Sequence, residues 1–207
     1  TTMPAGVVVD LDVCLQAPKH LWLSGVGDLV SKITAVRDWK RAFHHDGTYV
    51  DDFAALLSDS SVYQFIAKPE FDREGTKRLA TALMLNGISM AICGSSRPAS
   101  GSEHLISHAL DQLCDAPKLH GFQVGVATYL ISQLYAAETA TIDWLFETTG
   151  FWDALAASPI DRGALRDAIR LAPTIKENFH TILSDAGQIE RLIAILERDE
   201  RLQGLLC

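Results

Sequence analysis

The stretch "HGFQVGVATYLISQLYAAE" (His120 to Glu138) decides the fold class. Apolar residues occur nearly all round its helical projection and are not confined to one stripe. A helix that is hydrophobic on every side lies in the interior of a protein. The sequence therefore predicts a central helix that is covered by other elements.

Helical periodicity also dominates the chain before and after this stretch. Apolar residues recur at spacings of three and four in residues 49–67 and 71–93, and again from residue 141 onward. Upstream, Ser24 is expected to cap a helix that starts with "GDLVSK", which places Asp28 in its first turn. We expect an all-α fold, a bundle of about eight to ten helices.

One segment near the start shows a strand pattern. "GVVVDLDVC" (Gly6 to Cys14) is a β-branched run with an acidic tail. It has no second strand with which to pair, and an isolated strand is not stable. We expect an orphan β-strand whose exposed edge could pair with another copy, so a homo-oligomer is possible. The expected division is an interdomain strand or linker over residues 1–17 and a helical metal- and substrate-binding domain over residues 18–207.

Composition limits the classes of partner. The 207 residues are 48% hydrophobic and carry a formal net charge of −8, which argues against general nucleic-acid binding because that requires a basic face. No apolar run approaches the roughly 18 residues of a membrane span, and no signal peptide is visible. The four cysteines are scattered without a CxxC pair. Reduced thiols and a cytoplasmic location are the simplest expectation.

Three separate places carry residues that could bind a metal ion. They are Asp28 in "SGVGDLVSK", His104 with His108 in "GSEHLISHALD", and His120 in "KLHGFQVG". One aspartate and two histidines from three helix starts would suit a divalent cation such as zinc, with one position open to substrate. Each residue alone also has a simpler explanation: a carboxylate at a helix start interacts with the helix dipole, and an exposed HxxxH pair is often only solvated.

The order and separation of "SGVGDLVSKITAVRDW", "GSEHLISHALD" and "HGFQVGVAT" resemble the C-terminal half of sn-glycerol-1-phosphate dehydrogenases. These enzymes belong to the superfamily of iron-containing alcohol dehydrogenases, glycerol dehydrogenases and dehydroquinate synthases. The resemblance implies a metal-dependent, NAD(P)-linked oxidoreductase that interconverts dihydroxyacetone phosphate and sn-glycerol 1-phosphate. It also implies that Asp28, His104 and His120 hold the metal, which would be zinc, or alternatively nickel or iron. His108 would then be a catalytic or substrate-binding residue, or would only orient its helix.

Lys32 departs from the pattern of the four-ligand iron alcohol dehydrogenases, which have a histidine four residues after the aspartate. A protonated lysine has donors only and cannot bind a cation, so the departure favours three protein ligands and zinc-like chemistry. Lys32 lies one helical turn from Asp28 and could bind a substrate phosphate as a point charge. The alternative is a simple ion pair with Asp28.

A dinucleotide-binding motif is missing from the sequence. There is no glycine-rich turn behind a strand, which is the usual site for a pyrophosphate, and no residue is assigned to NAD(P). We therefore expect the metal-binding half of a larger dehydrogenase that is inactive alone and acts on a small phosphorylated polyol or ketone. The alternatives are a non-catalytic interaction or oligomerisation domain, a glycerol dehydrogenase, or a dehydroquinate synthase-like enzyme, although the last uses a glutamate at the first ligand position.

Overall fold

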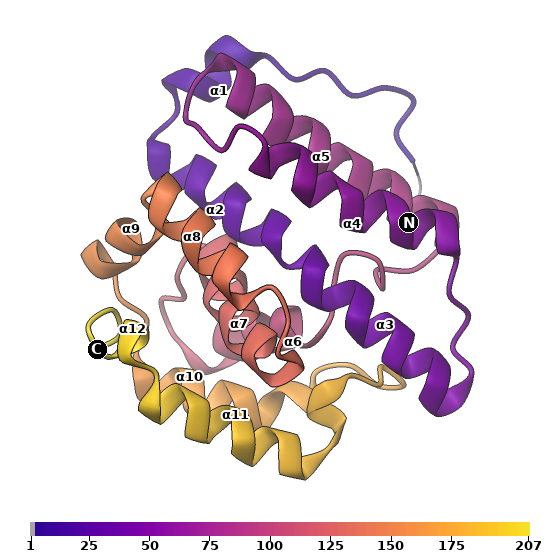
Figure 1. Ribbon diagram of the computed structural model, residues 1–207, viewed down its shortest axis with the longest axis vertical. Helices are drawn as coiled ribbons and strands as arrows, with labels where there is room; N and C mark the ends of the chain where they lie inside the picture. Colours follow the sequence, from indigo (N-terminus) through magenta and orange to yellow (C-terminus); the bar gives the residue numbers. More distant parts are fainter. Residues whose placement is uncertain (1–2) are drawn as a thin grey trace.

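The computed structural model describes residues 3–207 and is built from helices throughout that range (Figure 1). Twelve α-helices and two short 3-10 helices follow one another in this order: α1 (Leu11–Gln16), α2 (Lys19–Val30), α3 (Lys32–Asp46), α4 (Asp52–Ile66), α5 (Arg73–Cys93), α6 (Ser102–Leu113), α7 (His120–Tyr135), α8 (Thr139–Thr149), α9 (Phe151–Ala157), α10 (Arg162–Leu171), η1 (Ala172–Thr174), η2 (Ile182–Ser184), α11 (Ala186–Arg198) and α12 (Glu200–Gln203). The predicted all-α class is confirmed. The number of helices exceeds the expected eight to ten because breaks at Ser31, Gly150 and Asp199 divide longer helical stretches, and because α1 forms where a strand was expected.

Helix α7 is the central element, as its sequence predicts. Thirteen of its sixteen residues are buried. It packs against α2, α6, α8 and α11, so its apolar side chains are covered from several directions. The α4–α5 hairpin lies on the far side of α2, and α10 and α11 lie at the opposite edge of the molecule (Figure 1).

Local sequence signals set the ends of most helices. An aspartate side chain accepts a hydrogen bond from a first-turn N–H group at the starts of six helices, and these residues are Asp10, Asp51, Asp72, Asp161, Asp185 and Asp199. Glycines with positive φ end α3, α5 and α8, as expected for left-handed caps. These signals explain why the bounds of α4 and α5 agree closely with the expected ranges.

The predicted N-terminal strand is wrong. Within residues 3–207 no strand is formed; residues 6–10 have no regular structure, and α1 begins at Leu11. The physical reason is Asp10, whose carboxylate accepts hydrogen bonds from the N–H groups of Asp12 and Val13 and so starts a helix. Val8 is 96% exposed, while α1 packs on α5. The first two residues of the expected 1–17 linker lie outside the described range.

The expected helix start at Ser24 is also wrong. Helix α2 begins directly after Pro18, so Ser24 lies in its middle and Asp28 lies near its C-terminal end. The hydroxyl of Ser24 accepts a hydrogen bond of 3.1 Å from the N–H of Gly121, and therefore serves the start of α7 and not the start of its own helix. Ser31 separates α2 from α3.

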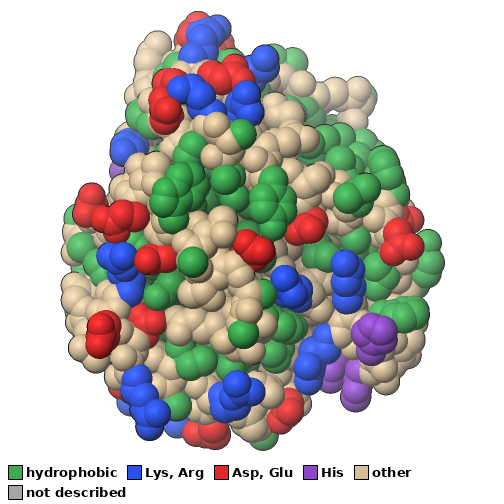
Figure 2. All heavy atoms as spheres, in the orientation of Figure 1, with side chains coloured by type: hydrophobic (Ala, Val, Ile, Leu, Met, Phe, Trp, Pro, Cys, Tyr) green, Lys and Arg blue, Asp and Glu red, His purple; other side chains and the backbone are tan. Residues whose placement is uncertain are grey.

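The surface is mixed in character. Acidic and basic side chains alternate over the face seen in Figure 2, and histidines gather towards the end of α3. None of the described helices has the length and apolar character that crossing a membrane requires. The four cysteines carry no disulfide.

Candidate metal centre

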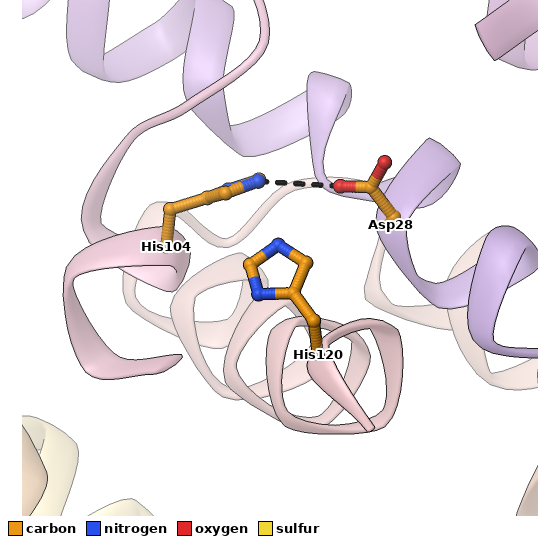
Figure 3. Close-up of side chains that lie close together, drawn as sticks. All are labelled: Asp28, His104 and His120. Carbon is orange, nitrogen blue, oxygen red and sulfur yellow. Dashed lines mark ion pairs between the residues drawn. The ribbon is translucent and has the colours of Figure 1, made fainter. Parts of the chain in front are cut away.

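Three helices bring one carboxylate and two imidazoles together (Figure 3). Asp28 comes from the end of α2, His104 from the first turn of α6, and His120 is the first residue of α7. One potential ligand atom from each residue lies within 4.8 Å of the others, and His104 Nε2 is 3.2 Å from Asp28 Oδ1. The expected meeting of three helix starts is therefore corrected to two helix starts and one helix end.

The separation of these atoms fits a bound cation. Ligand atoms that are each about 2.1 Å from a tetrahedral zinc ion lie about 3.4 Å from one another. The three ligand atoms would therefore need to close by at most about 1.4 Å. The His120 ring points into the space between Asp28 and His104 (Figure 3), so the ligands already surround a common point.

Glycines at the crossing of α2 and α7 permit this approach. A Cβ atom on Gly27 would lie 2.0 Å from the carbonyl oxygen of Gly121, and one on Gly121 would lie 1.7 Å from the carbonyl oxygen of Ser24. Both distances are far inside van der Waals contact. The glycines of "SGVGD" and "HGFQVG" therefore allow the two backbones to touch, which places Asp28 beside His120.

A chain of hydrogen bonds fixes the tautomer of His120. Gln123 Nε2 donates to the carbonyl of Lys118 and to Asp111, so its Oε1 faces the other way. Ser107 Oγ donates to that Oε1 at 2.8 Å and lies 3.1 Å from Nδ1 of His120. Because the serine hydroxyl has only one hydrogen, it must accept from a protonated Nδ1. His120 then presents an unprotonated Nε2, which is the form that binds metals.

His104 is oriented by a buried carboxylate. Its Nδ1 lies 3.0 Å from Oε1 of Glu103, a fully buried side chain. Glu103 also accepts hydrogen bonds from the N–H of Gly101 at 2.6 Å and from Thr34 Oγ1 at 2.9 Å. With Nδ1 occupied in this way, Nε2 of His104 faces Asp28.

The electrostatics of Asp28 and His120 suit a cation site, and a cation would have to displace the proton of His104. Burial raises the pKa of Asp28, but the charges of Lys32 and His104 outweigh it and hold that pKa well below its usual range. Burial lowers the pKa of His120 further below neutrality. For His104, burial opposes the charged form, yet the bonds to Asp28 and Glu103 leave the pKa raised. The carboxylate is thus ionised and one imidazole neutral at pH 7.

Lys32 is buried behind Asp28. Its ammonium group donates to Asp28 Oδ1 at 3.2 Å, to Ser31 Oγ at 3.0 Å and to the carbonyl of Ala99 at 3.0 Å. An ammonium group has three donors, so all are engaged. A substrate phosphate could bind Lys32 only by replacing one of these partners.

A cleft of about 710 Å³ opens onto the three ligands. His108 lies on its wall with its side chain half exposed and its Nδ1 3.8 Å from Asp111 Oδ2. The His108 ring centroid is 5.8 Å from that of His120 and 6.5 Å from that of His104. The HxxxH pair is therefore divided between a buried residue in the centre and an exposed residue facing the cleft.

Curated proteins with sequences similar to this chain share one name. Proteins named glycerol-1-phosphate dehydrogenase [NAD(P)+] are 42% identical over 188 residues in Pyrococcus horikoshii, 38% over 207 residues in Pyrococcus furiosus and 36% over 202 residues in Cenarchaeum symbiosum. The chain is similar to glycerol-1-phosphate dehydrogenases. The alignments cover 89%, 98% and 95% of this chain but only 54%, 59% and 56% of those relatives. The chain thus spans about half the length of the curated relatives that it matches, and no family model matches it.

The resemblance to glycerol-1-phosphate dehydrogenases predicted from the motifs is thereby confirmed. The structure brings together Asp28, His104 and His120 and places Lys32 and His108 on the same cleft. Sequence reasoning missed Gln123, whose only signal was its position one turn after His120. It also gave no reason to prefer Ser107 and Glu103 over other polar neighbours, because those roles depend on contacts between helices.

Proposed function

We propose that this chain provides the metal centre and substrate cleft of an NAD(P)-dependent glycerol-1-phosphate dehydrogenase. The reaction converts dihydroxyacetone phosphate, NAD(P)H and a proton into sn-glycerol 1-phosphate and NAD(P)⁺, and runs in reverse. Residues 18–207 form the metal- and substrate-binding domain in this proposal, and residues 1–17 connect it to a dinucleotide-binding part.

The observation that carries the proposal is the ligand arrangement in the described residues. Asp28 is ionised, His120 presents an unprotonated Nε2, and Nε2 of His104 faces the same space. An oxygen and two imidazole nitrogens with an open side towards a cleft match a catalytic zinc site more closely than a closed structural site. Nickel and iron remain alternatives because imidazole suits both.

The bound cation would supply Lewis-acid stabilisation of the negative charge that develops on the substrate oxygen during hydride transfer. The chain itself supplies three further functions. Lys32 holds the Asp28 carboxylate in place, and Ser107 and Glu103 orient the two histidines. His108, half exposed on the cleft wall, is placed to pass a proton between the substrate oxygen and solvent.

Zinc binding to the 207-residue chain tests the ligand assignment. The wild-type chain should bind about one equivalent of zinc, and Asp28→Ala or His120→Ala should abolish tight binding. His20→Ala is a suitable control because His20 is an exposed histidine of α2 that does not line the cleft. Zinc retained at wild-type affinity by both ligand variants would overturn the proposal.

The preference for one small molecule over another distinguishes the proposed activity from its alternatives. The zinc-loaded chain should bind sn-glycerol 1-phosphate more tightly than glycerol, whereas a glycerol dehydrogenase would show no such preference. A non-catalytic interaction domain would bind neither. We also expect no oxidation of NADH by the chain alone with dihydroxyacetone phosphate, because no residue between 3 and 207 is assigned to the dinucleotide; measured turnover would contradict the proposed division of domains.

A further inference from the structure

The cleft wall carries positive charge outside the metal centre as well. The lining includes Asp28, Lys32 and the three histidines, and also Ser96, Ser100 and Lys176. Asp28 is the single carboxylate among its described lining residues, and it belongs to the metal centre. A substrate that enters the cleft therefore meets no acidic side chain on the wall beyond the metal.

Lys176 and its neighbour Arg97 form no ion pair with a carboxylate within the described part of the chain. Lys176 Nζ lies 3.9 Å from the centroid of the Phe179 ring, and the guanidinium carbon of Arg97 lies 3.6 Å from the same centroid. Arg97 is buried and donates to the carbonyl of His180 at 2.6 Å, but neither it nor Lys176 forms an ion pair there. Burial and then the charge of Arg97 lower the pKa of Lys176, so an anion bound beside Lys176 would offset the repulsion between the two cations.

Lys176 and Lys32 form hydrogen bonds with the same short turn. Ser96 Oγ accepts a hydrogen bond of 3.0 Å from Lys176, and the carbonyl of Ala99 accepts one of 3.0 Å from Lys32. The N–H of Ala99 bonds back to the carbonyl of Ser96 at 3.0 Å, which makes residues 96–99 a β-turn with ends less than about 7 Å apart. Lys176 and Lys32 thus bond to opposite ends of one turn on the cleft wall, a separation that suits the two ends of a three-carbon phosphate ester.

We propose that Lys176, together with the Ser96 hydroxyl and with Arg97 behind it, binds the phosphate group of the substrate. This inference rests on the proposed function, because it assumes that the substrate's oxygen end lies at the metal. Lys176 is exposed and makes a single hydrogen bond, so it can turn towards a ligand without losing buried contacts. Lys32 acts instead on Asp28, since all three of its donors are engaged within the protein.

Affinity measurements on the zinc-loaded 207-residue chain test this assignment. Calorimetric titration with sn-glycerol 1-phosphate, inorganic phosphate and glycerol should show that Lys176→Ala weakens binding of both phosphates about tenfold or more. Binding of glycerol and of zinc should not change. Lys176→Arg should restore most of the affinity because it keeps the charge. Lys77→Ala, which removes an exposed lysine of α5 outside the cleft, is the matched control.

The outcomes separate this inference from the proposed function. Zinc binding with equal phosphate affinity in wild type and Lys176→Ala would overturn the role of Lys176 and leave the metal centre intact. The role of Lys176 is also overturned if the wild-type chain binds no phosphate, or if Lys32→Ala retains zinc but alone loses phosphate affinity. A wild-type chain that binds phosphate through Lys176 but holds no zinc would support the phosphate site and reject the metal centre.

Discussion

The protonation of one ring nitrogen decides whether His120 can bind a metal. Its Nδ1 hydrogen is fixed by Ser107, which is fixed in turn by the Gln123 amide. Neither residue touches the proposed cation. The affinity of the centre therefore depends on polar groups behind the ligands, which hold the imidazole in one tautomer and one orientation.

Ser107→Ala should weaken zinc binding about 10- to 100-fold without unfolding the chain. The substitution removes the acceptor for Nδ1 of His120, so the imidazole can rotate and change tautomer. Competition against a chromophoric chelator would measure the zinc affinity. Ser89→Ala is the matched control, because Ser89 is equally buried and its hydroxyl bonds to the carbonyl of Ala54, away from the cleft. Equal zinc affinities for the two variants would contradict the role of Ser107.

Asp38 should make stability depend on pH. Its carboxylate is fully buried and accepts bonds from the N–H groups of Ser102 and Ile182 and from Tyr135. Burial, and then the nearby Glu103, raise its pKa from 3.8 to about 6. Between these values the folded state holds a proton that the unfolded state has released. The contribution of Asp38 to the free energy of unfolding therefore falls as pH rises, by up to about 3 kcal/mol.

Urea unfolding of wild type and Asp38→Asn at pH 4 and pH 7 would measure this dependence. The asparagine variant cannot titrate at this position, so its stability should fall less between the two pH values. Its stability should be lower than that of wild type at both, because the amide nitrogen cannot accept the hydrogen bonds that the second carboxyl oxygen accepts in either protonation state. An identical pH dependence in the two proteins would show that Asp38 is not protonated in the folded state.

At the scale of helices, the contact between α2 and α7 joins fold and site. Gly27 and Gly121 allow the backbones to meet, and Ser24 provides a hydrogen bond across the same contact. Asp28 follows Gly27 directly, and His120 precedes Gly121. The positions of Asp28 and His120 are therefore fixed by the neighbouring glycines. A change in the angle or distance at which α2 and α7 cross would change the distance between the two ligands.

Gly121→Ala should destabilise the fold by about 3 kcal/mol or more and weaken zinc binding as well. Its methyl group would overlap the Ser24 carbonyl, which forces α7 away from α2 and His120 away from Asp28. Gly87→Ala is the control in α5: its Cβ would meet nothing within 4 Å, so stability should rise by about 0.5–1 kcal/mol. Thermal unfolding and zinc titration measure both effects, and unchanged zinc affinity in Gly121→Ala would contradict the coupling.

The helices that sequence predicts well are those whose signals are local. Helix α7 is apolar on every side, and Asp51 and Asp72 cap α4 and α5 where their periodicity begins. The predictions that are wrong concern residues whose local pattern is compatible with two different structures. Asp10 ends a β-branched run but also caps a helix, and Ser24 has the residue type of a cap but binds the N–H of another helix.

For the molecule as a whole, the sequence predicts which residues are metal ligands but does not predict how they come together in space. Asp28, His104 and His120 were separable from other polar residues only through the resemblance to a known family, since each has a simpler local explanation. Lys176 lies far from all three in the sequence and reaches the cleft only through folding. Contacts of this kind depend on how the helices pack, which residue spacing within one helix does not encode.

Zinc should stabilise the whole chain, because its three ligands belong to helices that span residues 19–135. A ligand that binds only the folded state at 100 times its dissociation constant adds about 2.7 kcal/mol. For a chain of this size that corresponds to a rise in Tm of about 5–10 °C. The rise should be absent in His120→Ala, which folds through the same core but lacks a ligand. Equal rises in wild type and His120→Ala would mean that zinc binds elsewhere, since an ion at this centre cannot stabilise a variant that has lost one of its three protein ligands to the same extent.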